Sequence, residues 1–461
     1  MMFNIAKVIS DIEADSDQNI DLLKDLLKIK SISTIPDYTD QCYQAAGWLK
    51  TFLDSFGMNA MIYESEGHPI VFSEYQTTRP DAKTILFYGH YDVQPVDPVS
   101  LWDSDPFDPV LSSINNEPCI IARGASDDKG QLLTFLLALK YLKNEVGELP
   151  FSLKIILEGE EECGSKTLPI FLEDYKNKLS ADIAYVCDTG MWDKDTPAIT
   201  RSLRGLLSEE FKIIGPDRDL HSGEFGGVAW NPIRIITKIL SDVYDDDGKV
   251  TIPNFYEGVG EVNENIINSW KKLTFNEAEY LNKIGQKSSS GENGKSIFEK
   301  TWSRPTFEIN GIFGGYTDEG TKTVIPSEAN AKITCRLVGN QDPKKILEDI
   351  HKYIKSCLPD GVQVIFDGAD YCRAIEFDTD SYYFQSASEA IEEEWGVKPV
   401  FTGGGGSIPV VEAFKTLLNM DTVLIGFALD DDRIHSPNEK YNVSSYVKGI
   451  KTWARIIAKY Q

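Results

Sequence analysis

Histidine and carboxylate side chains stand directly after four apolar segments of this 461-residue chain. His90 and Asp92 follow KTILFYG, and the glutamate-rich stretch EGEEECGS (158–165) follows FSLKIIL. Asp188 follows ADIAYVC, and His435 lies in DDDRIHSPNEKY, which comes after DTVLIGFAL. Imidazole nitrogens and carboxylate oxygens are the ligands that zinc and similar divalent ions take in proteins. The residue types therefore indicate a metal site.

Each of these features has an ordinary structural interpretation when it is taken alone. Asp127 and Asp128 lie just before a segment with strong helical periodicity (129–146), where an acidic pair usually caps the helix and favours its dipole. A single histidine after a strand is usually a hydrogen-bonded surface or core residue, and GEEE is usually a solvated loop. Their coincidence is harder to explain, because burying uncompensated carboxylates together costs on the order of several kcal/mol or forces them to protonate. A pair of cations removes that difficulty, and Asp92 is placed to orient the ring of His90.

The apolar segments are expected to be strands of one α/β domain. Strands alternate with helical segments before about residue 195 and again after about residue 385, which predicts a mostly parallel sheet covered by helices. Ligands of such sheets bind at the carboxyl ends of the strands, where the histidines and carboxylates fall. Between these parts, shorter and more alternating strands predict a small α+β domain. We therefore expect an α/β domain of residues 1–194 and 386–461, interrupted by an inserted domain of residues 195–385.

Composition excludes several classes of protein. The net charge of -26 argues against binding to nucleic acids or to anionic membrane surfaces, which need clustered Lys and Arg. No apolar run reaches the roughly 20 residues of a transmembrane helix, and no secretory signal is visible near Met1. The seven cysteines form no CxxC pair. These features predict reduced thiols and a cytoplasmic location.

Eight short stretches, in this order, resemble the motifs of one enzyme family: YGHYDVQP, ARGASDDKG, EGEEECGS, CDTG, HSGEFGG, TKTVIP, GGGGSIP and HSPNEKY. The family is that of the co-catalytic zinc metallopeptidases, which includes carnosinases, cytosolic dipeptidases, glutamate carboxypeptidase, aminoacylase and succinyl-diaminopimelate desuccinylase. The resemblance covers nearly the whole chain and is strongest to the dipeptidase branch. It implies an α/β catalytic domain with a mostly parallel sheet, interrupted by an α+β domain that serves as a lid and forms a homodimer.

The resemblance implies two zinc ions per subunit. One ion would be held by His90 and Asp188 and the other by Glu162 and His435, with Asp127 bridging the two. It also implies a cis peptide bond after Asp127. Manganese or cobalt would suit the same ligands.

The resemblance also implies catalytic roles. Glu161 would be the general base for a water molecule that bridges the metals, and Asp92 would support the neighbouring ligand. His221, in HSGEFGG, would stabilise the oxyanion from the partner subunit. Arg336 would bind the terminal carboxylate of the substrate, and Thr323 is a weaker substrate contact.

The glycine-rich stretch GGGGSIP permits a close backbone approach before a helix, whose N-terminal N–H groups bind anions. Gly405, Gly406 and Ser407 are therefore candidates for carboxylate binding; a phosphate loop is the alternative, but its GK[ST] ending is absent. His68 and His351 match no motif and are expected at the surface.

The leading interpretation is a dizinc metallopeptidase that cleaves the amide bond of dipeptides or similar small peptides. An N-acyl amino acid deacylase of the aminoacylase or desuccinylase type is the alternative within the same chemistry. A non-catalytic binding module on the same fold is the alternative from another class, and the intact set of ligands and base argues against it. The two hydrolases differ in whether the pocket pairs a free amine or fits an acyl chain.

Overall fold

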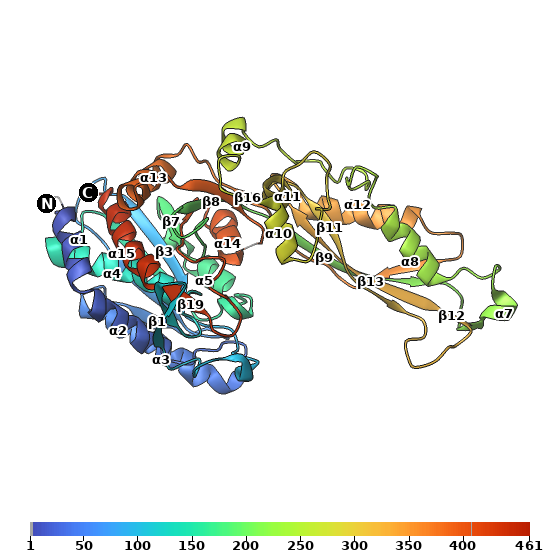
Figure 1. Cartoon of the computed structure of the whole chain (residues 1–461), viewed down its shortest axis with the longest axis horizontal. Helices are drawn as coiled ribbons and strands as arrows, with labels where there is room; N and C mark the ends of the chain where they lie inside the picture. Colours follow the sequence, from blue (N-terminus) through green and yellow to red (C-terminus); the bar gives the residue numbers. More distant parts are fainter. Residues whose placement is uncertain (1–2, 407) are drawn as a thin grey trace. The chain divides into compact units, whose positions relative to one another are not determined.

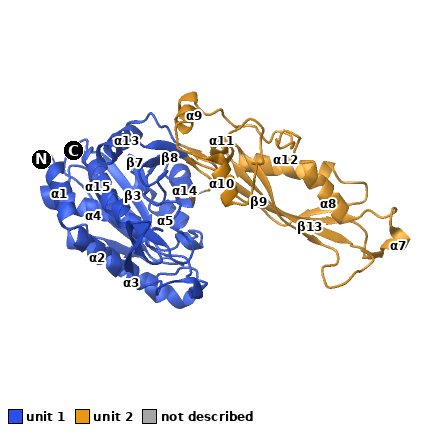
Figure 2. Ribbon diagram, viewed as in Figure 1, with its two compact units in different colours: residues 1–201, 377–402, 409–461 blue, residues 202–376, 403–408 orange. Residues whose placement is uncertain are grey.

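The computed structural model describes residues 3–406 and 408–461 (Figure 1). The chain divides into two compact units, coloured separately in Figure 2. Unit 1 comprises Met1–Arg201, Phe377–Thr402 and Pro409–Gln461, and unit 2 comprises Ser202–Glu376 and Gly403–Ile408. The chain therefore leaves the first unit and returns to it near its end.

The larger sheet, among the described residues, has nine strands. Their order is β1 (Met61–Tyr63), β2 (Ile70–Tyr75), β6 (Ser152–Glu158), β3 (Thr84–His90), β7 (Ile183–Val186), β18 (Thr422–Leu424), β8 (Ala198–Leu203) and β16 (Ile375–Glu376), with β17 (Val400–Gly404) also paired to β8. The central strands β6, β3, β7 and β18 are parallel to their neighbours in this group, whereas the flanking strands pair antiparallel. The predicted α/β class with a mostly parallel central sheet is confirmed.

The central strands are apolar because helices cover them. All residues of β6 and β7 are buried, as expected for strands enclosed on both faces. Helix α4 (Lys129–Val146) packs on β3, and α15 (Val443–Ala458) packs on α4. The rings of Phe87 and Phe135 stack with centroids 3.7 Å apart, and Trp453 meets Phe135 edge-on at 5.3 Å. This aromatic core holds the two helices against the strand that ends at His90.

The parallel strands end at one edge of the sheet. β3 ends on His90, β6 ends on Glu158, and Asp188 follows β7 by two residues. Because parallel strands share a direction, their carboxyl ends bring residues distant in sequence together.

Unit 2 is built on a five-stranded antiparallel sheet in the part of the chain described. Strands β11 (Thr306–Gly314), β13 (Glu328–Leu337), β9 (Gly205–Ile214) and β14 (Gln363–Phe366) follow one another, and β15 (Asp370–Cys372) also pairs with β9. The residues of β9 alternate between buried and partly buried, as expected for a sheet with one covered face. Helices α8 (Pro232–Ser241) and α12 (Pro343–Ser356) supply apolar residues to the core on that face.

None of the helices within 3–406 and 408–461 combines the length and the apolar character needed to cross a bilayer.

Candidate metal centre

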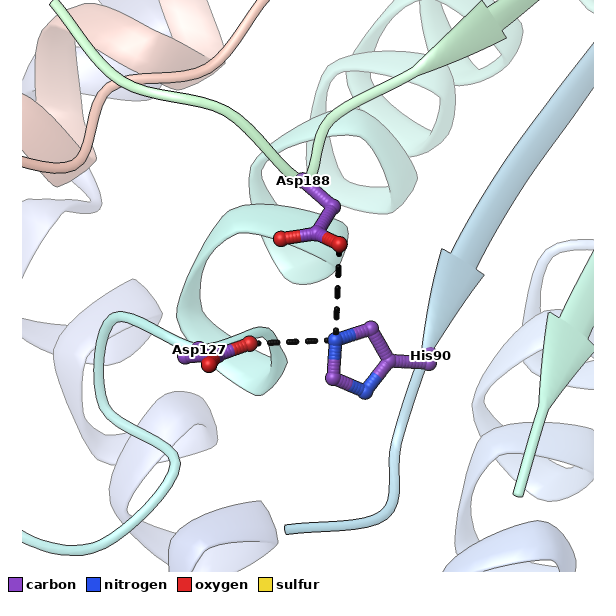
Figure 3. Close-up of side chains that lie close together, drawn as sticks. All are labelled: His90, Asp127 and Asp188. Carbon is purple, nitrogen blue, oxygen red and sulfur yellow. Dashed lines mark hydrogen bonds and ion pairs between the residues drawn. The ribbon is translucent and has the colours of Figure 1, made fainter. Parts of the chain in front are cut away.

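The first group of predicted ligands gathers at the end of β3. His90 Nε2 lies 3.1 Å from Asp127 Oδ1 and 4.0 Å from Asp188 Oδ2 (Figure 3). The three side chains come from the end of β3, the loop before α4 and the segment after β7. One ligand atom from each lies within 4.8 Å of the other two, so one cation can contact all three residues.

The second group shares Asp127 with the first. His435 Nε2 lies 3.0 Å from Asp127 Oδ2 and 3.2 Å from Glu162 Oε2. Asp127 therefore presents Oδ1 to His90 and Oδ2 to His435, which is the arrangement of a carboxylate that bridges two cations. The structure thus brings all five predicted ligands together. The peptide bond between Asp127 and Asp128 is cis, as the resemblance implied.

The carboxylates favour positive charge on both imidazoles. Burial of His90 lowers its pKa, but hydrogen bonds with Asp127 and Asp92 outweigh burial and raise the pKa well above the usual value. Hydrogen bonds with Asp127 and Glu162 raise the pKa of His435 to about 10. Divalent cations bound to neutral imidazoles would supply the same positive charge. Their binding displaces the imidazole protons. The donor set therefore fits metal ions.

Asp92 connects the first group to the glutamate-rich turn. His90 Nδ1 lies 3.2 Å from the carbonyl oxygen of Asp92 and 3.4 Å from its Oδ1. The same carboxylate accepts the backbone N–H groups of Glu161 at 3.2 Å and Glu162 at 3.0 Å. Asp92 thus orients the His90 ring, as its spacing predicted, and also positions the turn η3 (Glu161–Cys163), which sequence patterns did not indicate.

Glu161 has the environment of a proton acceptor. Burial raises its pKa to about 8; the carboxylates of Asp188 and Glu162 add to this rise, and the positive charge of His90 opposes it. A raised pKa makes a carboxylate a stronger base than an ordinary glutamate, and cations held by the two ligand groups would offset part of this rise. Burial likewise raises the pKa of Asp188 to about 6.

Glu439 is a residue of the site that sequence reasoning missed. Its fully buried carboxylate accepts the backbone N–H groups of Gly124, Ser126 and Asp127, and it pairs with the guanidinium of Arg123 at 2.8 Å. These bonds hold the loop that carries Asp127. Glu439 lies in the HSPNEKY motif. In the sequence, the signal that could have pointed to it was a charged residue directly beside a buried strand.

The remaining predicted residues belong to unit 2. His221 ends strand β10 (Leu220–His221) and is exposed, and its Nδ1 accepts the N–H of Gly223 at 3.0 Å. Thr323 is exposed, and its carbonyl oxygen accepts the N–H of Ser222. Arg336 lies on β13 and is partly buried. His221 and Thr323 are therefore neighbours through adjacent backbone.

Gly403 and Gly404 of the glycine-rich stretch are the last residues of β17, and Gly405 and Gly406 lie between that strand and α14 (Pro409–Leu417). The carbonyl oxygen of Gly405 accepts a hydrogen bond from Arg204 at 3.0 Å, and Gly406 has open space where a Cβ would stand. Ser407 lies outside the described residues.

The expectation for His68 was wrong. Its side chain is buried, and Nε2 lies 2.8 Å from the carbonyl oxygen of Ser33. The absence of a motif says nothing about burial, because burial is decided by packing. His351 is partly exposed and pairs with Glu209 at 2.6 Å.

Comparison with known proteins identifies the family. The family described as "Peptidase family M20/M25/M40" matches residues 86–459. The Cys-Gly metallodipeptidase DUG1 of Saccharomyces cerevisiae is 32% identical over 401 residues, which cover 85% of this chain and 82% of that protein. The Beta-Ala-His dipeptidase of Homo sapiens is 28% identical over 472 residues, which cover 98% and 91% of the two chains.

Solved structures agree with the sequence comparison. The di-peptidase Dug1p from Saccharomyces cerevisiae has a TM-score of 0.78 at 28% identity, covering 100% of this chain and 99% of that one. The M20 family metallo-carboxypeptidase Sso-CP2 from Sulfolobus solfataricus has a TM-score of 0.79 at 32% identity, with 96% and 99% covered. The resemblance to the dipeptidase branch is thereby confirmed. The chain belongs to the M20/M25/M40 peptidase family and is a hydrolase that acts on peptide bonds.

Proposed function

We propose that this protein is a dizinc dipeptidase that hydrolyses the peptide bond of dipeptides and similar small peptides. The observation that carries the proposal is the carboxylate of Asp127, whose two oxygens face His90 and His435 separately. The similar proteins from yeast and human that are named as dipeptidases support the substrate class.

Glu161 is the proposed general base. Zinc ions bound by the two ligand groups would make a water molecule more acidic and polarise the carbonyl of the substrate. Glu161 takes a proton from the attacking water and passes it to the leaving nitrogen. Asp92 keeps the backbone of Glu161 in place during this transfer.

His221 and Arg336 are proposed to act on the substrate. Because Nδ1 of His221 accepts the N–H of Gly223, the neutral ring carries its proton on Nε2, and this tautomer donates to an oxyanion. Arg336 offers a guanidinium to the terminal carboxylate, with Thr323, Gly405 and Gly406 as further contacts.

A homodimer is proposed, in which the inserted domain (195–385) serves as lid and dimerisation element and His221 acts in the partner's site. Strand β11 is the end strand of the unit 2 sheet and exposes Ile309, Ile312 and Phe313. An end strand of nine residues with exposed apolar side chains favours pairing with another strand. All seven cysteines lie in the described ranges as free thiols, which supports the proposed cytoplasmic location.

The test compares two substrate panels on the zinc-loaded protein. Dipeptides with a free amine should be hydrolysed faster than N-acyl amino acids, and faster turnover of the acylated panel would replace this proposal with a deacylase. Metal analysis should find two ions per subunit, and reconstitution with Zn2+, Mn2+ or Co2+ compares the three metals. Glu161→Gln should retain the metal and lose about two to four orders of magnitude in kcat, whereas a non-catalytic module would show no turnover in either form.

A further inference from the structure

Two arginine side chains lie on the same face of unit 2. Arg336 on β13 pairs with Leu206 on β9, and Arg204 precedes Leu206 by two residues. Side chains two residues apart in an extended chain point to the same face, and diagonal neighbours across a strand pair lie about 7–8 Å apart. The two guanidinium groups are therefore neighbours although the two residues are 132 positions apart in sequence.

Neither guanidinium forms an ion pair with a carboxylate anywhere in residues 3–406 and 408–461. Arg204 instead donates from Nε to the carbonyl oxygen of Gly405 at 3.0 Å and from Nη1 to that of Lys300 at 3.4 Å. Burial and the neighbouring charge of Arg336 lower the pKa of Arg204 to about 10, while the carboxylate of Glu308 opposes this shift. Two like charges in a half-buried position favour the binding of an anion.

The glycine-rich loop is held in place beside Arg204. A Cβ at Gly403 would stand 2.5 Å from Cβ of Trp302, and a Cβ at Gly405 would stand 3.5 Å from Nη2 of Arg204. Trp302 stacks on Phe298 with ring centroids 4.7 Å apart. Helix α11 (Ile297–Trp302) thus braces the loop from one side and, through the carbonyl of Lys300, holds Arg204.

We propose that Arg204 is a second carboxylate-binding residue, which acts together with Arg336 on the terminal carboxylate of the substrate. A carboxylate has two oxygens that together accept about four hydrogen bonds, so it can satisfy two guanidinium groups at once. Arg204 has its Nε and Nη1 fixed on backbone carbonyls, which leaves Nη2 in a defined position. The inference rests on the proposed function. The two arginines together make the enzyme selective for substrates with a free C-terminal carboxylate over the corresponding amides.

The test compares Ala-Leu with its C-terminal amide on the zinc-loaded full chain. Arg204→Met should raise KM for Ala-Leu about tenfold or more with kcat nearly unchanged, because a charge-assisted hydrogen bond to the substrate is lost. It should lower kcat/KM for the amide by a clearly smaller factor, because the amide lacks the charged group that Arg204 binds. Arg204→Lys, which keeps the charge, should restore part of the affinity for Ala-Leu. Arg218→Met, which removes an exposed arginine of the same unit, should change kcat and KM for neither substrate.

Equal losses on the acid and the amide would overturn the inference and leave Arg204 as a support of the loop. A second measurement does not need turnover: calorimetry should show that wild type prefers leucine over leucinamide and that Arg204→Met loses this preference about tenfold. An unchanged preference would also overturn the inference. If wild type binds leucine through Arg204 but hydrolyses no dipeptide, the proposed function fails and the carboxylate site stands.

Discussion

Glu439 accepts the backbone N–H of Asp127 through Oε1 at 3.0 Å. The residue that lies between the two imidazoles is therefore held by a carboxylate 312 positions further along the chain. Arg123 pairs with the same buried carboxylate and offsets its charge. The position of Asp127 thus depends on Glu439, which contacts neither His90 nor His435 through any hydrogen bond in the described part of the chain.

Replacing Glu439 by Gln should weaken metal binding. The amide offers one acceptor oxygen where the carboxylate offers two, so some N–H groups of the loop 124–127 lose their partners. Changes in residues that orient metal ligands typically reduce metal affinity about 10–100-fold. Competition with a zinc chelator measures this affinity. Glu117→Gln, at a partly exposed carboxylate, is the matched control, and equal affinities in the two variants would contradict the positioning role.

Glu158 should make the metal-free protein less stable as pH rises. Burial raises the pKa of Glu158 from 4.5 to about 8, and Tyr88 donates to its carboxyl at 2.5 Å. The folded state therefore holds the proton to about pH 8, whereas the unfolded chain releases it near pH 4.5. The stabilisation is complete below the unfolded-state pKa. It decreases as the pH rises toward the folded-state pKa and is lost above that pKa. The free energy of unfolding falls by up to about 1.4 kcal/mol per pH unit in this range.

Urea denaturation of chelator-treated protein across this pH window measures that slope. Glu158→Gln keeps an acceptor for Tyr88 and has no proton to lose, so its free energy of unfolding should depend less steeply on pH. Glu148→Gln, at an exposed position, should retain the wild-type slope. A Glu158→Gln profile parallel to wild type would show that Glu158 is not the titrating group.

Gly223→Ala should impair catalysis without removing metal. The added Cβ would stand 2.8 Å from Cε1 of His221 and 3.1 Å from its Nδ1, so the ring must move. If His221 donates to the oxyanion, kcat should fall by about 10–100-fold, and His221→Ala should cost about 100–1,000-fold. Gly260→Ala, where a Cβ meets open space, is the control. Wild-type kcat in Gly223→Ala would argue against a role for the ring orientation.

Ile312→Lys should produce monomers if β11 forms the dimer interface. A charged side chain on an end strand opposes strand pairing, and Ile312 is 45% exposed. Light scattering coupled to gel filtration measures the mass. Ile365→Lys makes the same change on β14, the short strand at the other end of the sheet path, and should leave the dimer intact. If only Ile365→Lys dissociates the dimer, the interface is formed by β14 and not by β11.

Mixed dimers test whether His221 acts across subunits. A His221→Ala chain retains its own Glu161, and a Glu161→Gln chain retains its own His221. Unfolding and refolding the two inactive chains together should restore part of the activity, because one of the two sites in a mixed dimer then has both residues. Demonstrated mixed dimers without activity would assign His221 to its own subunit.

The sequence by itself determined the fold class and the family. Apolar segments that end in His90, in the glutamate-rich stretch and just before Asp188 predicted parallel strands, because strands covered on both faces are continuously apolar. The shared direction of such strands then predicted that these side chains meet at one edge. Motif order identified the family, and Asp92 was expected beside His90 from a spacing of two residues.

Only the tertiary structure decided contacts between distant segments. It brought Glu439 into hydrogen-bonding contact with the backbone of Asp127, buried His68 against Ser33, and placed Arg204 beside the glycine-rich loop. A local pattern reports which face of a strand or helix is apolar, whereas each of these contacts depends on how separate segments pack. The two oxygens of Asp127 likewise face different histidines only because a strand end and a loop more than 300 residues away converge on one carboxylate.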